Sequence, residues 1–255
     1  MPYVALAHAG RVHYAERGER RPGRPSAVLI HGAGASAAIW MMVLARVARA
    51  GHAIAIDLPG HGPSAAGGAA LDGAQGLTLA RYRDAVGELA GTLCLGPSWL
   101  VGHSLGALVA IEAALAWPDK VRGLVLCAAA PRLPVNDELA RLLRDDPARV
   151  IPWLADNALS PRAKPAVRRG FLAAGEATPA EVTRADFEIV RAADVSGRID
   201  ALACPVIWID GADDRIVPAT EGRKGAITTL ADVGHLTPIE APASVADAIK
   251  TALAD

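Results

Sequence analysis

The chain has 255 residues, of which 52% are apolar, and its formal net charge is -1. This near balance of charges gives no electrostatic reason to expect nucleic acid or a membrane surface as a partner, so we expect a small-molecule substrate. The length allows one large α/β domain, or a core with a modest insertion.

Cysteine use and the first residues bear on the cellular compartment. The three cysteines are far apart, without C-x-x-C or other ligand spacing, and we expect reduced packing residues. They are Cys94, Cys127 and Cys204. The first residues lack a basic start followed by a long apolar run, and no apolar stretch is long enough to span a bilayer. We therefore expect a cytoplasmic protein.

In chain order, the first 20 residues predict two short strands joined at Ala9-Gly10. Short apolar runs that are typical of strands buried in a parallel sheet then cover residues 27–30, 53–56, 99–101, 124–126 and 206–209. Apolar residues at helical spacing predict helices over residues 37–50, 78–95 and 105–117. Thr78 stands at the N-cap position of the second helix. This alternation predicts a mostly parallel α/β sheet with helices on both faces.

The alternation stops between Pro131 and Ala203. That stretch contains helix-like, Arg-rich segments interrupted by prolines, so we expect a helical segment inserted after the sixth strand. Beyond it, residues 226–233 predict a last strand and residues 242–254 a closing helix.

A G-x-S-x-G pentapeptide lies at residues 102–106, between a predicted strand and a predicted helix. This context is that of a nucleophile elbow. The sharp turn holds the serine hydroxyl clear of the sheet, and the glycines permit it because a side chain there would collide with the neighbouring strand or helix. Ser104 is therefore the candidate nucleophile.

A second glycine-rich loop, residues 31–34, follows the first core strand. We expect its backbone N–H groups and that of Leu105 to face the same point and form an oxyanion hole. On its own this signal is weak, because many α/β proteins have a glycine-rich turn after a strand.

The sequence offers seven histidines as the base. His235 is the candidate because it follows the last predicted strand, at the carboxyl edge of the sheet where open α/β folds keep their sites. His31 and His103 flank the nucleophile region, and we expect their imidazoles to bond to nearby main chain and orient these loops. The other four are expected to be structural or solvent-exposed: His8, His13, His52 and His61.

The base needs a carboxylate to fix its tautomer. The strand that ends at Ile209 is followed by three aspartates. We choose Asp214, because the chain has by then turned off the sheet toward His235. Asp213 and Asp210 stay open as alternatives, since each aspartate is also an ordinary turn residue.

Five motifs occur in the order that the α/β-hydrolase superfamily has them: residues 31–34, 57–64, 102–106, 211–218 and 234–242. Through them almost the whole chain resembles that superfamily, in particular its capped esterase, lactonase and carbon–carbon hydrolase branch. The resemblance implies an α/β-hydrolase fold with a core of residues 1–130 and 201–255 and a helical cap of residues 131–200. The chain departs from the pattern after Pro218, where a helix is cut to about one turn.

The resemblance also implies site residues. The catalytic triad is Ser104, Asp214 and His235, and the backbone N–H groups of Ala33 and Leu105 are the oxyanion donors. No metal-ligand spacing or dinucleotide fingerprint occurs, so we expect no metal and no cofactor. The candidate pocket residues are His31, Gly32, His103, Trp153, Leu154 and Leu236.

These residues favour cleavage of a carboxylic ester of a small to medium apolar substrate through an acyl-enzyme on Ser104. Carbon–carbon hydrolysis, lactonase action and cofactor-free perhydrolysis stay open, because fold and triad do not fix the substrate. A non-catalytic ligand-binding protein on the same fold is the alternative from another class.

Ten arginines in the cap raise a further hypothesis, a docking face for an acidic carrier protein. Because acidic residues are interspersed among them, we favour a solvated helix surface. The apolar residues of the cap either line an acyl pocket or form a small core of their own.

Overall fold

The computed structural model describes residues 2–66, 73–217 and 223–254. These residues form an eight-stranded sheet in the order β1-β2-β4-β3-β5-β6-β7-β8. The strands are β1 (Tyr3–Leu6), β2 (Gly10–Arg17), β3 (Ser26–Ile30), β4 (His52–Ile56), β5 (Ser98–His103), β6 (Val121–Cys127), β7 (Val206–Gly211) and β8 (Ala226–Leu230). β1 and β2 are antiparallel and the other strands are parallel, as the sequence predicts.

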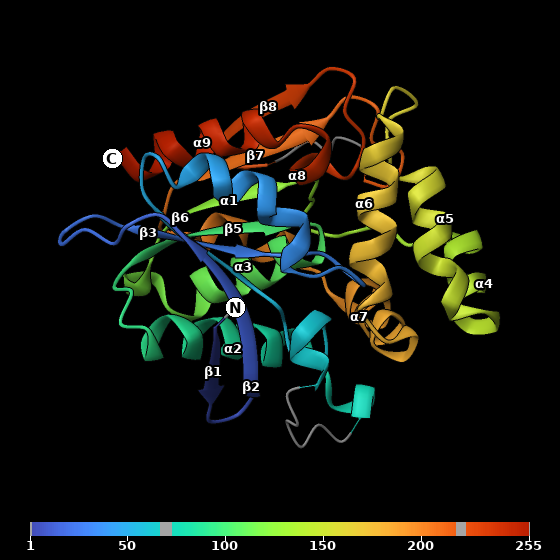
Figure 1. Ribbon diagram of the computed structural model, residues 1–255, viewed down its shortest axis with the longest axis horizontal. Helices are drawn as coiled ribbons and strands as arrows, with labels where there is room; N and C mark the ends of the chain where they lie inside the picture. The colour runs from blue at the N-terminus through green and yellow to red at the C-terminus, as the bar shows by residue number, and fades with distance from the viewer. Residues whose placement is uncertain (1, 67–72, 218–222, 255) are drawn as a thin grey trace.

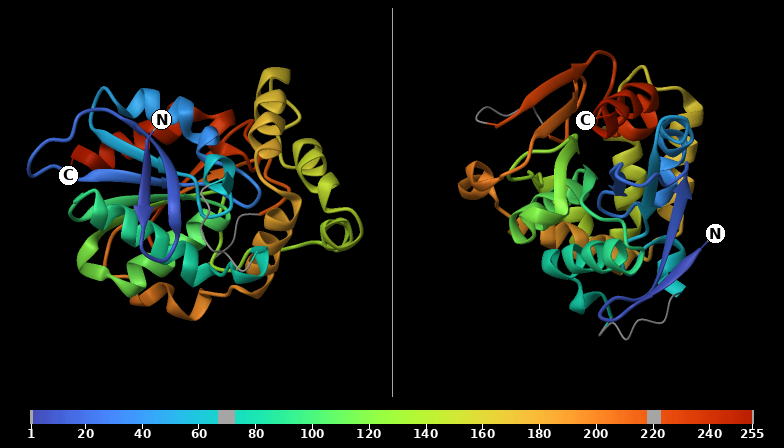
Figure 2. Two further views of the ribbon diagram at one scale, coloured as in Figure 1. Left: turned by 60° about the horizontal axis from the view of Figure 1, so that its bottom comes forward. Right: turned by 90° about the vertical axis from the view of Figure 1, so that its left-hand side faces the viewer.

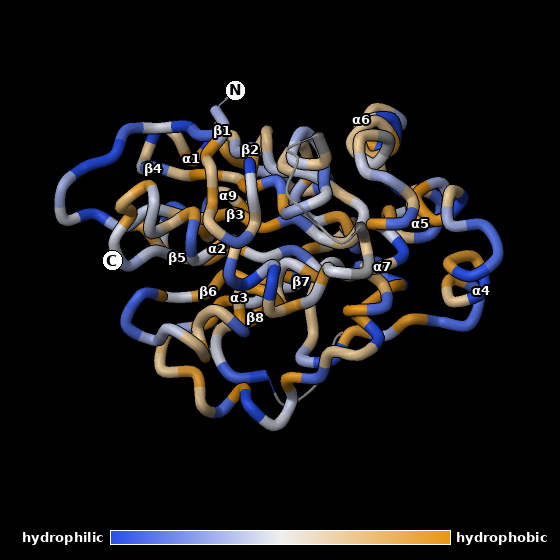
Figure 3. Tube along the Cα trace, turned by 90° about the horizontal axis from the view of Figure 1, so that it is seen from below, coloured by the Kyte–Doolittle hydropathy of each residue, from blue (hydrophilic) through white to orange (hydrophobic). Residues whose placement is uncertain are grey.

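Helices cover both faces of this sheet (Figure 1). One face carries α1 (Met41–Val47) and α9 (Pro242–Ala254), and the other carries α2 (Leu79–Thr92) and α3 (Leu105–Ala116). β3, β4 and β5 are buried along their whole length because helices lie on both sides of them. Apolar burial on this scale is the main source of stability of such a fold. The strongly hydrophilic stretches lie mostly in the outer loops (Figure 3).

Short 3-10 turns complete the core: η1 (Ala37–Trp40), η2 (Gly62–Ala66), η3 (Gly73–Gly76) and η4 (Pro118–Lys120). The helix expected over residues 37–50 is therefore split into η1 and α1. The strand expected over residues 226–233 ends at Leu230, its last partner being Gly211, and Asp232 then turns the chain with a φ of 60°. The Thr78 hydroxyl oxygen accepts the N–H of Arg81, which confirms the predicted N-cap.

Between β6 and β7 the chain forms a separate group of helices, the cap. It consists of α4 (Asp137–Asp145), η5 (Pro147–Arg149), α5 (Val150–Asn157), α6 (Pro165–Glu176), α7 (Ala180–Ala192) and η6 (Ser196–Ala201). Helices α4 to α7 gather at one end of the sheet (Figures 1 and 2). The fold is thus the α/β-hydrolase fold, with its helical insertion after the sixth strand.

The cap has an apolar cluster that it shares with the core. Leu139, Leu143, Leu154 and Phe171 are buried in it together with Leu236 of the core. Most apolar side chains of the cap therefore pack against one another.

Two further expectations concern the cysteines and the segment after Pro218. Cys127 is buried and Cys204 partly buried, but Cys94, just after the end of α2, is exposed. Cys94 is therefore not a packing residue.

The shortened helix expected after Pro218 falls on residues 218–222, outside the described residues. Among the described residues, no helix is long and apolar enough to cross a bilayer.

Candidate active site

Ser104 stands on the turn between β5 and α3. Its backbone has φ 51° and ψ -117°, which is a strained conformation for a residue with a side chain. The turn leaves no room at its two glycines: a Cβ at Gly102 would lie 2.4 Å from the Gly106 oxygen, and one at Gly106 would lie 2.3 Å from the Ile30 oxygen. The G-x-S-x-G motif thus reflects close backbone contact of the turn with α3 and β3.

His235 follows β8 on a loop at the same edge of the sheet. Its Nδ1 lies 2.9 Å from Oδ2 of Asp214, and both side chains are buried. When Nδ1–H donates to this carboxylate, Nε2 is left as the basic nitrogen of the ring. His235 and Ser104 line the same pocket. Within the described part of the chain no hydrogen bond joins their side chains. Such bonds are often loose without substrate and tighten in the reacting complex.

Asp214 is held by its own loop. Its Oδ1 accepts the N–H groups of Ile216 at 2.8 Å and Val217 at 2.9 Å. Burial by itself raises the pKa of this carboxyl, but His235 and the two N–H groups outweigh burial and leave the pKa below its usual value. Asp214 is thus held in its ionised form beside His235.

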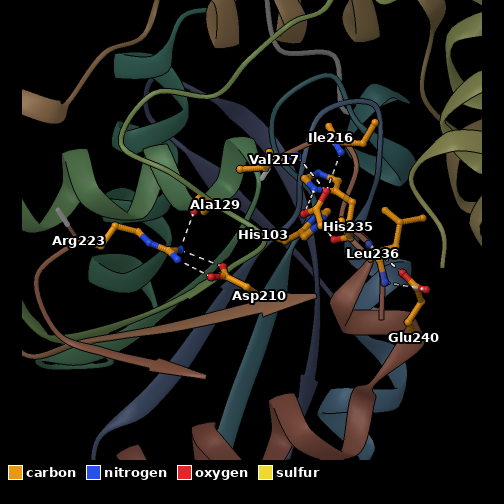
Figure 4. Close-up of polar contacts among 11 residues, drawn as sticks. His103, Ala129, Asp210, Ile216, Val217, Arg223, His235, Leu236 and Glu240 are labelled. Carbon is orange, nitrogen blue, oxygen red and sulfur yellow. Dashed lines mark hydrogen bonds and ion pairs between the residues drawn. The ribbon is translucent and has the colours of Figure 1, made fainter. Parts of the chain in front are cut away.

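The other two aspartates have different partners. Oδ2 of Asp213 accepts the Ser160 hydroxyl at 2.6 Å. Asp210 forms a two-pronged ion pair with Arg223, at 3.0 and 2.5 Å (Figure 4). Of the three candidates, Asp214 is the one that contacts His235.

Two unpaired backbone N–H groups lie near Ser104. Leu105 is the first residue of α3, where N–H groups have no partner within the helix, and Ala33 lies on the loop after β3. Neither N–H donates a hydrogen bond within the described part of the chain. The start of α3 touches the end of β3, because Gly106 approaches the backbone of Ile30 and His31. This contact places the two loops side by side.

An apolar pocket opens onto Ser104 and His235. Of the six candidate pocket residues, His103, Leu154 and Leu236 line it. Its described lining holds no Asp, Glu, Lys or Arg, and consists of Ala33, Ala35, Ile39, His103, Ser104, Leu133, Pro134, Leu154, Phe171, Phe187, Val190, Ile216, Val217, His235 and Leu236. The cap supplies Leu154, Phe171 and Phe187, so the pocket lies between cap and core.

The other three candidates do not line this pocket. His31 is fully buried below it, where its Nδ1–H donates to the Gly32 carbonyl and its Nε2 accepts the Leu58 N–H. Gly32 packs against the His103 ring, and Trp153 packs in the apolar cluster of the cap.

A comparison with protein-family models matches residues 27–248 to the family described as "Alpha/beta hydrolase family". The chain belongs to this family. Pimeloyl-[acyl-carrier protein] methyl ester esterase of Sodalis glossinidius is 32% identical over 206 residues, which cover 75% of this chain and 76% of that protein. The (E)-2-((N-methylformamido)methylene)succinate hydrolase of Acinetobacter baylyi is 34% identical over 123 residues, covering 48% and 43%.

Solved structures agree on the fold of this hydrolase. The enol-lactonase of Burkholderia xenovorans LB400 superimposes with a TM-score of 0.84 at 24% identity, over 100% of both chains. An esterase of Exiguobacterium antarcticum gives 0.85 at 16% identity, over 99% of both chains. At these identities the likeness concerns the fold alone.

The histidine loop of the hydrolase is clamped by Glu240, at the end of α8 (Thr237–Glu240). Its carboxylate accepts the N–H groups of Gly234 at 3.1 Å and Ser160 at 2.8 Å. It also accepts the N–H of Leu236 at 3.1 Å (Figure 4). Burial raises the pKa of Glu240, and the three N–H groups offset part of that rise. The sequence did not predict a role for Glu240, although this residue lies five positions after His235, within the motif of residues 234–242.

His103 lies behind His235. Its Nε2–H donates to the His235 carbonyl at 3.0 Å, while its Nδ1 has no partner among the described residues. Burial, together with the neighbouring His235 ring, lowers the pKa of His103 to about 3. Like His31, His103 bonds to main chain as the sequence predicts, and it stays neutral near neutral pH.

The remaining histidines lie away from Ser104 and pair with carboxylates. His8 is exposed beside Glu88, whereas the rings of His13, His52 and His61 are buried. Their carboxylate partners are Asp57, Glu16 and Asp186 respectively. Among the residues that the structure describes, no three His, Cys, Asp or Glu side chains group as metal ligands.

Proposed function

We propose that this hydrolase cleaves carboxylic esters of small to medium apolar substrates, with Ser104 as nucleophile, His235 as base and Asp214 as the acid that orients it. The observation that carries the proposal is a buried His235–Asp214 pair facing the same pocket as a serine on a strained turn. The name of the Sodalis esterase supports ester cleavage.

The reaction follows from these positions. His235 Nε2 takes the Ser104 proton as the oxygen attacks the ester carbonyl, and the N–H groups of Ala33 and Leu105 stabilise the oxyanion. The tetrahedral intermediate collapses, the alcohol leaves with the proton from His235, and an acyl-enzyme remains. Water that gives its proton to His235 then attacks the acyl-enzyme, and collapse of the second intermediate releases the acid and returns the proton to Ser104.

The pocket supports an apolar acyl group, because its described lining holds no Asp, Glu, Lys or Arg side chain. Carbon–carbon bond cleavage, lactone opening and perhydrolysis use the same triad. We rank them below ester cleavage because the relative with the wider coverage is named as an esterase.

The test is hydrolysis of p-nitrophenyl esters of increasing acyl length by the wild type and by Ser104→Ala. We expect the variant to lose at least about 10³-fold in kcat, because the nucleophile is gone. Ser98→Ala is the matched control: Ser98 begins the strand that precedes Ser104, and its hydroxyl donates only to the Gly96 carbonyl. Equal turnover by wild type and Ser104→Ala would refute the proposal, and tight ligand binding without any turnover would favour a non-catalytic binding protein.

A carrier-bound ester is a second candidate, and a groove between α4 and α7 favours it. Three arginines and one glutamate line this groove: Arg144, Arg184, Arg191 and Glu188. Phe187 lines both the groove and the active-site pocket. Other cap arginines have acidic partners: Arg162 pairs with Asp232, and Arg168 with Asp156. Arg144 of the groove also lies 3.7 Å from Asp145, so the cap surface is mixed in charge, and the groove is the part where arginines outnumber acidic residues.

Salt dependence separates the two candidates. Docking of an acidic carrier predicts turnover that falls as salt rises, while turnover of a free ester stays constant. Arg191→Gln should then reduce turnover of the carrier-bound ester alone, whereas Arg46→Gln on α1 should change neither. Equal salt response of both substrates would remove the carrier proposal and leave free-ester cleavage.

A further inference from the structure

A carboxylate of the cap contacts the oxyanion loop, which we define as residues 31–36. Asp186 of α7 is fully buried, and its Oδ2 accepts the Gly34 N–H at 2.8 Å. The same oxygen lies 2.7 Å from His61 Nε2, and Oδ1 accepts the Tyr82 hydroxyl at 2.6 Å. One side chain of the insertion thus bonds to three separate segments of the core.

The His61 ring gives this carboxylate a counter-charge. Its Nδ1 bonds to the Pro59 carbonyl at 3.1 Å and its Nε2 to Asp186, and because both partners only accept, both nitrogens carry hydrogen. Burial by itself lowers the pKa of His61, but Asp186, the Pro59 carbonyl and Asp57 together outweigh burial and raise it. Removing one member of a buried pair leaves the other uncompensated, so this contact is expensive to break.

Gly34 and Ala35 make further contacts with the cap. Gly34 has a φ of 64°, and a Cβ there would lie 2.7 Å from Ile151 Cδ1 and 2.9 Å from Thr183 Cγ2. The Thr178 hydroxyl donates to the Ala35 carbonyl at 3.1 Å. The outer side of the loop is therefore built on the cap, while Ala33, the neighbour of Gly34, lines the pocket beside Ser104.

We propose that Asp186 is a positioning residue for ester cleavage: by holding the Gly34 N–H it fixes the orientation of the adjacent peptide, and with it the Ala33 N–H that stabilises the oxyanion. This inference rests on the proposed function. The cap would then contribute to the rate of ester cleavage, because an oxyanion donor acts only if it is held close to where the negative charge develops.

The experiment compares Asp186→Ala and Asp186→Asn with the wild type. Asp186→Ala removes the acceptor of Gly34, whereas Asp186→Asn keeps one oxygen for it and removes the charge. Arg198→Gln is the matched control, because Arg198 joins the same insertion to Glu112 of α3 at an exposed site far from the loop. Each protein is measured for kcat and KM with p-nitrophenyl acetate, for inhibition by butylboronic acid, and for hydrogen exchange of the Gly34 amide.

We expect Asp186→Ala to lower kcat by about 10- to 100-fold, with KM within about threefold of wild type, because small misplacements of a catalytic group cost rates of this order. The boronic acid, whose adduct presents an oxyanion, should lose affinity in parallel with kcat. Exchange of the Gly34 amide should rise in Asp186→Ala and less in Asp186→Asn, which should also recover part of kcat. Arg198→Gln should stay within about twofold of wild type.

The outcomes separate this inference from the proposed function. Unchanged kcat and boronic acid affinity in Asp186→Ala, with an active wild type and an inactive Ser104→Ala, would overturn the positioning role and leave ester hydrolysis standing. No turnover by the wild type would overturn ester hydrolysis, and Gly34 exchange would then decide whether Asp186 holds the loop. If Asp186→Ala does not fold, a kcat and Gly34 exchange for Asp186→Asn equal to those of wild type would refute the inference.

Discussion

Asp214 and Asp213 are neighbours in the chain with different tasks in the structure. Asp214 contacts His235, and Asp213 contacts Ser160. We predict that Asp214→Asn lowers kcat by about 10³- to 10⁴-fold, because an amide that donates toward Nδ1 favours the tautomer with hydrogen on Nε2. Asp213→Asn should keep kcat within about tenfold. Steady-state kinetics on both variants check this, and a larger loss in Asp213→Asn would reverse the assignment.

Asp214 should also make the free energy of unfolding depend on pH. Because the pKa of Asp214 is lowered in the folded protein, its ionised form contributes stability above the unfolded value of about 3.9, and this contribution is lost as pH falls through the lower folded pKa. We predict that wild type exceeds Asp214→Asn in free energy of unfolding at pH 7, and that the gap narrows below about pH 4. Urea unfolding at both pH values measures it. A difference in free energy of unfolding that grows in acid would contradict the lowered pKa of Asp214.

Single residues were predictable where chemistry demands a particular side chain in a particular context. Ser104 and His235 stood out because a strained turn needs flanking glycines and a base needs a loop at the carboxyl edge of the sheet. Glu240 was missed because its partners are backbone N–H groups, which every sequence offers. Asp186 was missed because its partners His61 and Tyr82 lie 125 and 104 positions away in the chain. Asp186 also acts on a residue 152 positions away, and no local pattern reports such a contact.

At the scale of elements, the short helix α8 acts as a clamp. Its last residue, Glu240, accepts N–H groups on both sides of His235 and one from the cap. We predict that Glu240→Gln lowers the free energy of unfolding by about 1–3 kcal/mol and also lowers kcat, because the amide nitrogen cannot accept these N–H groups. The exposed Asp247→Asn on α9 should stay within about 0.5 kcal/mol. Urea unfolding and steady-state kinetics test both variants. Equal free energies of unfolding and equal kcat values for Glu240→Gln and Asp247→Asn would contradict the role of Glu240 in holding the histidine loop.

The predicted order of strands and helices is confirmed, while some boundaries moved. Apolar spacing continues from Ala37 to Ala50, but the backbone changes from η1 to α1 at Trp40 and turns after Val47. Periodicity identifies which residues face the core, and it does not report where a helix tightens or frays. The packing between the cap and the oxyanion loop could not be predicted either, because periodicity along one segment does not report which distant segment it contacts.

At the scale of the whole molecule, cap and core share apolar contacts. Leu236, Ile239 and Ile216 of the core pack in the same cluster as the cap helices. We predict a single cooperative thermal transition, with calorimetric and van't Hoff enthalpies that agree, because neither part buries its apolar surface alone. Differential scanning calorimetry checks this. Two resolved transitions, with the pocket lost in the first, would show that the cap unfolds independently.

The strained turn at Ser104 has a consequence for how this protein changes under selection. Its φ of 51° suits glycine, and such strain costs about 1–3 kcal/mol in a residue with a side chain. Replacing the nucleophile by glycine would therefore make the fold more heat-resistant while abolishing the proposed chemistry. A screen for thermal tolerance alone would enrich inactive variants at this position, so any stabilised library of this hydrolase needs turnover as a second criterion.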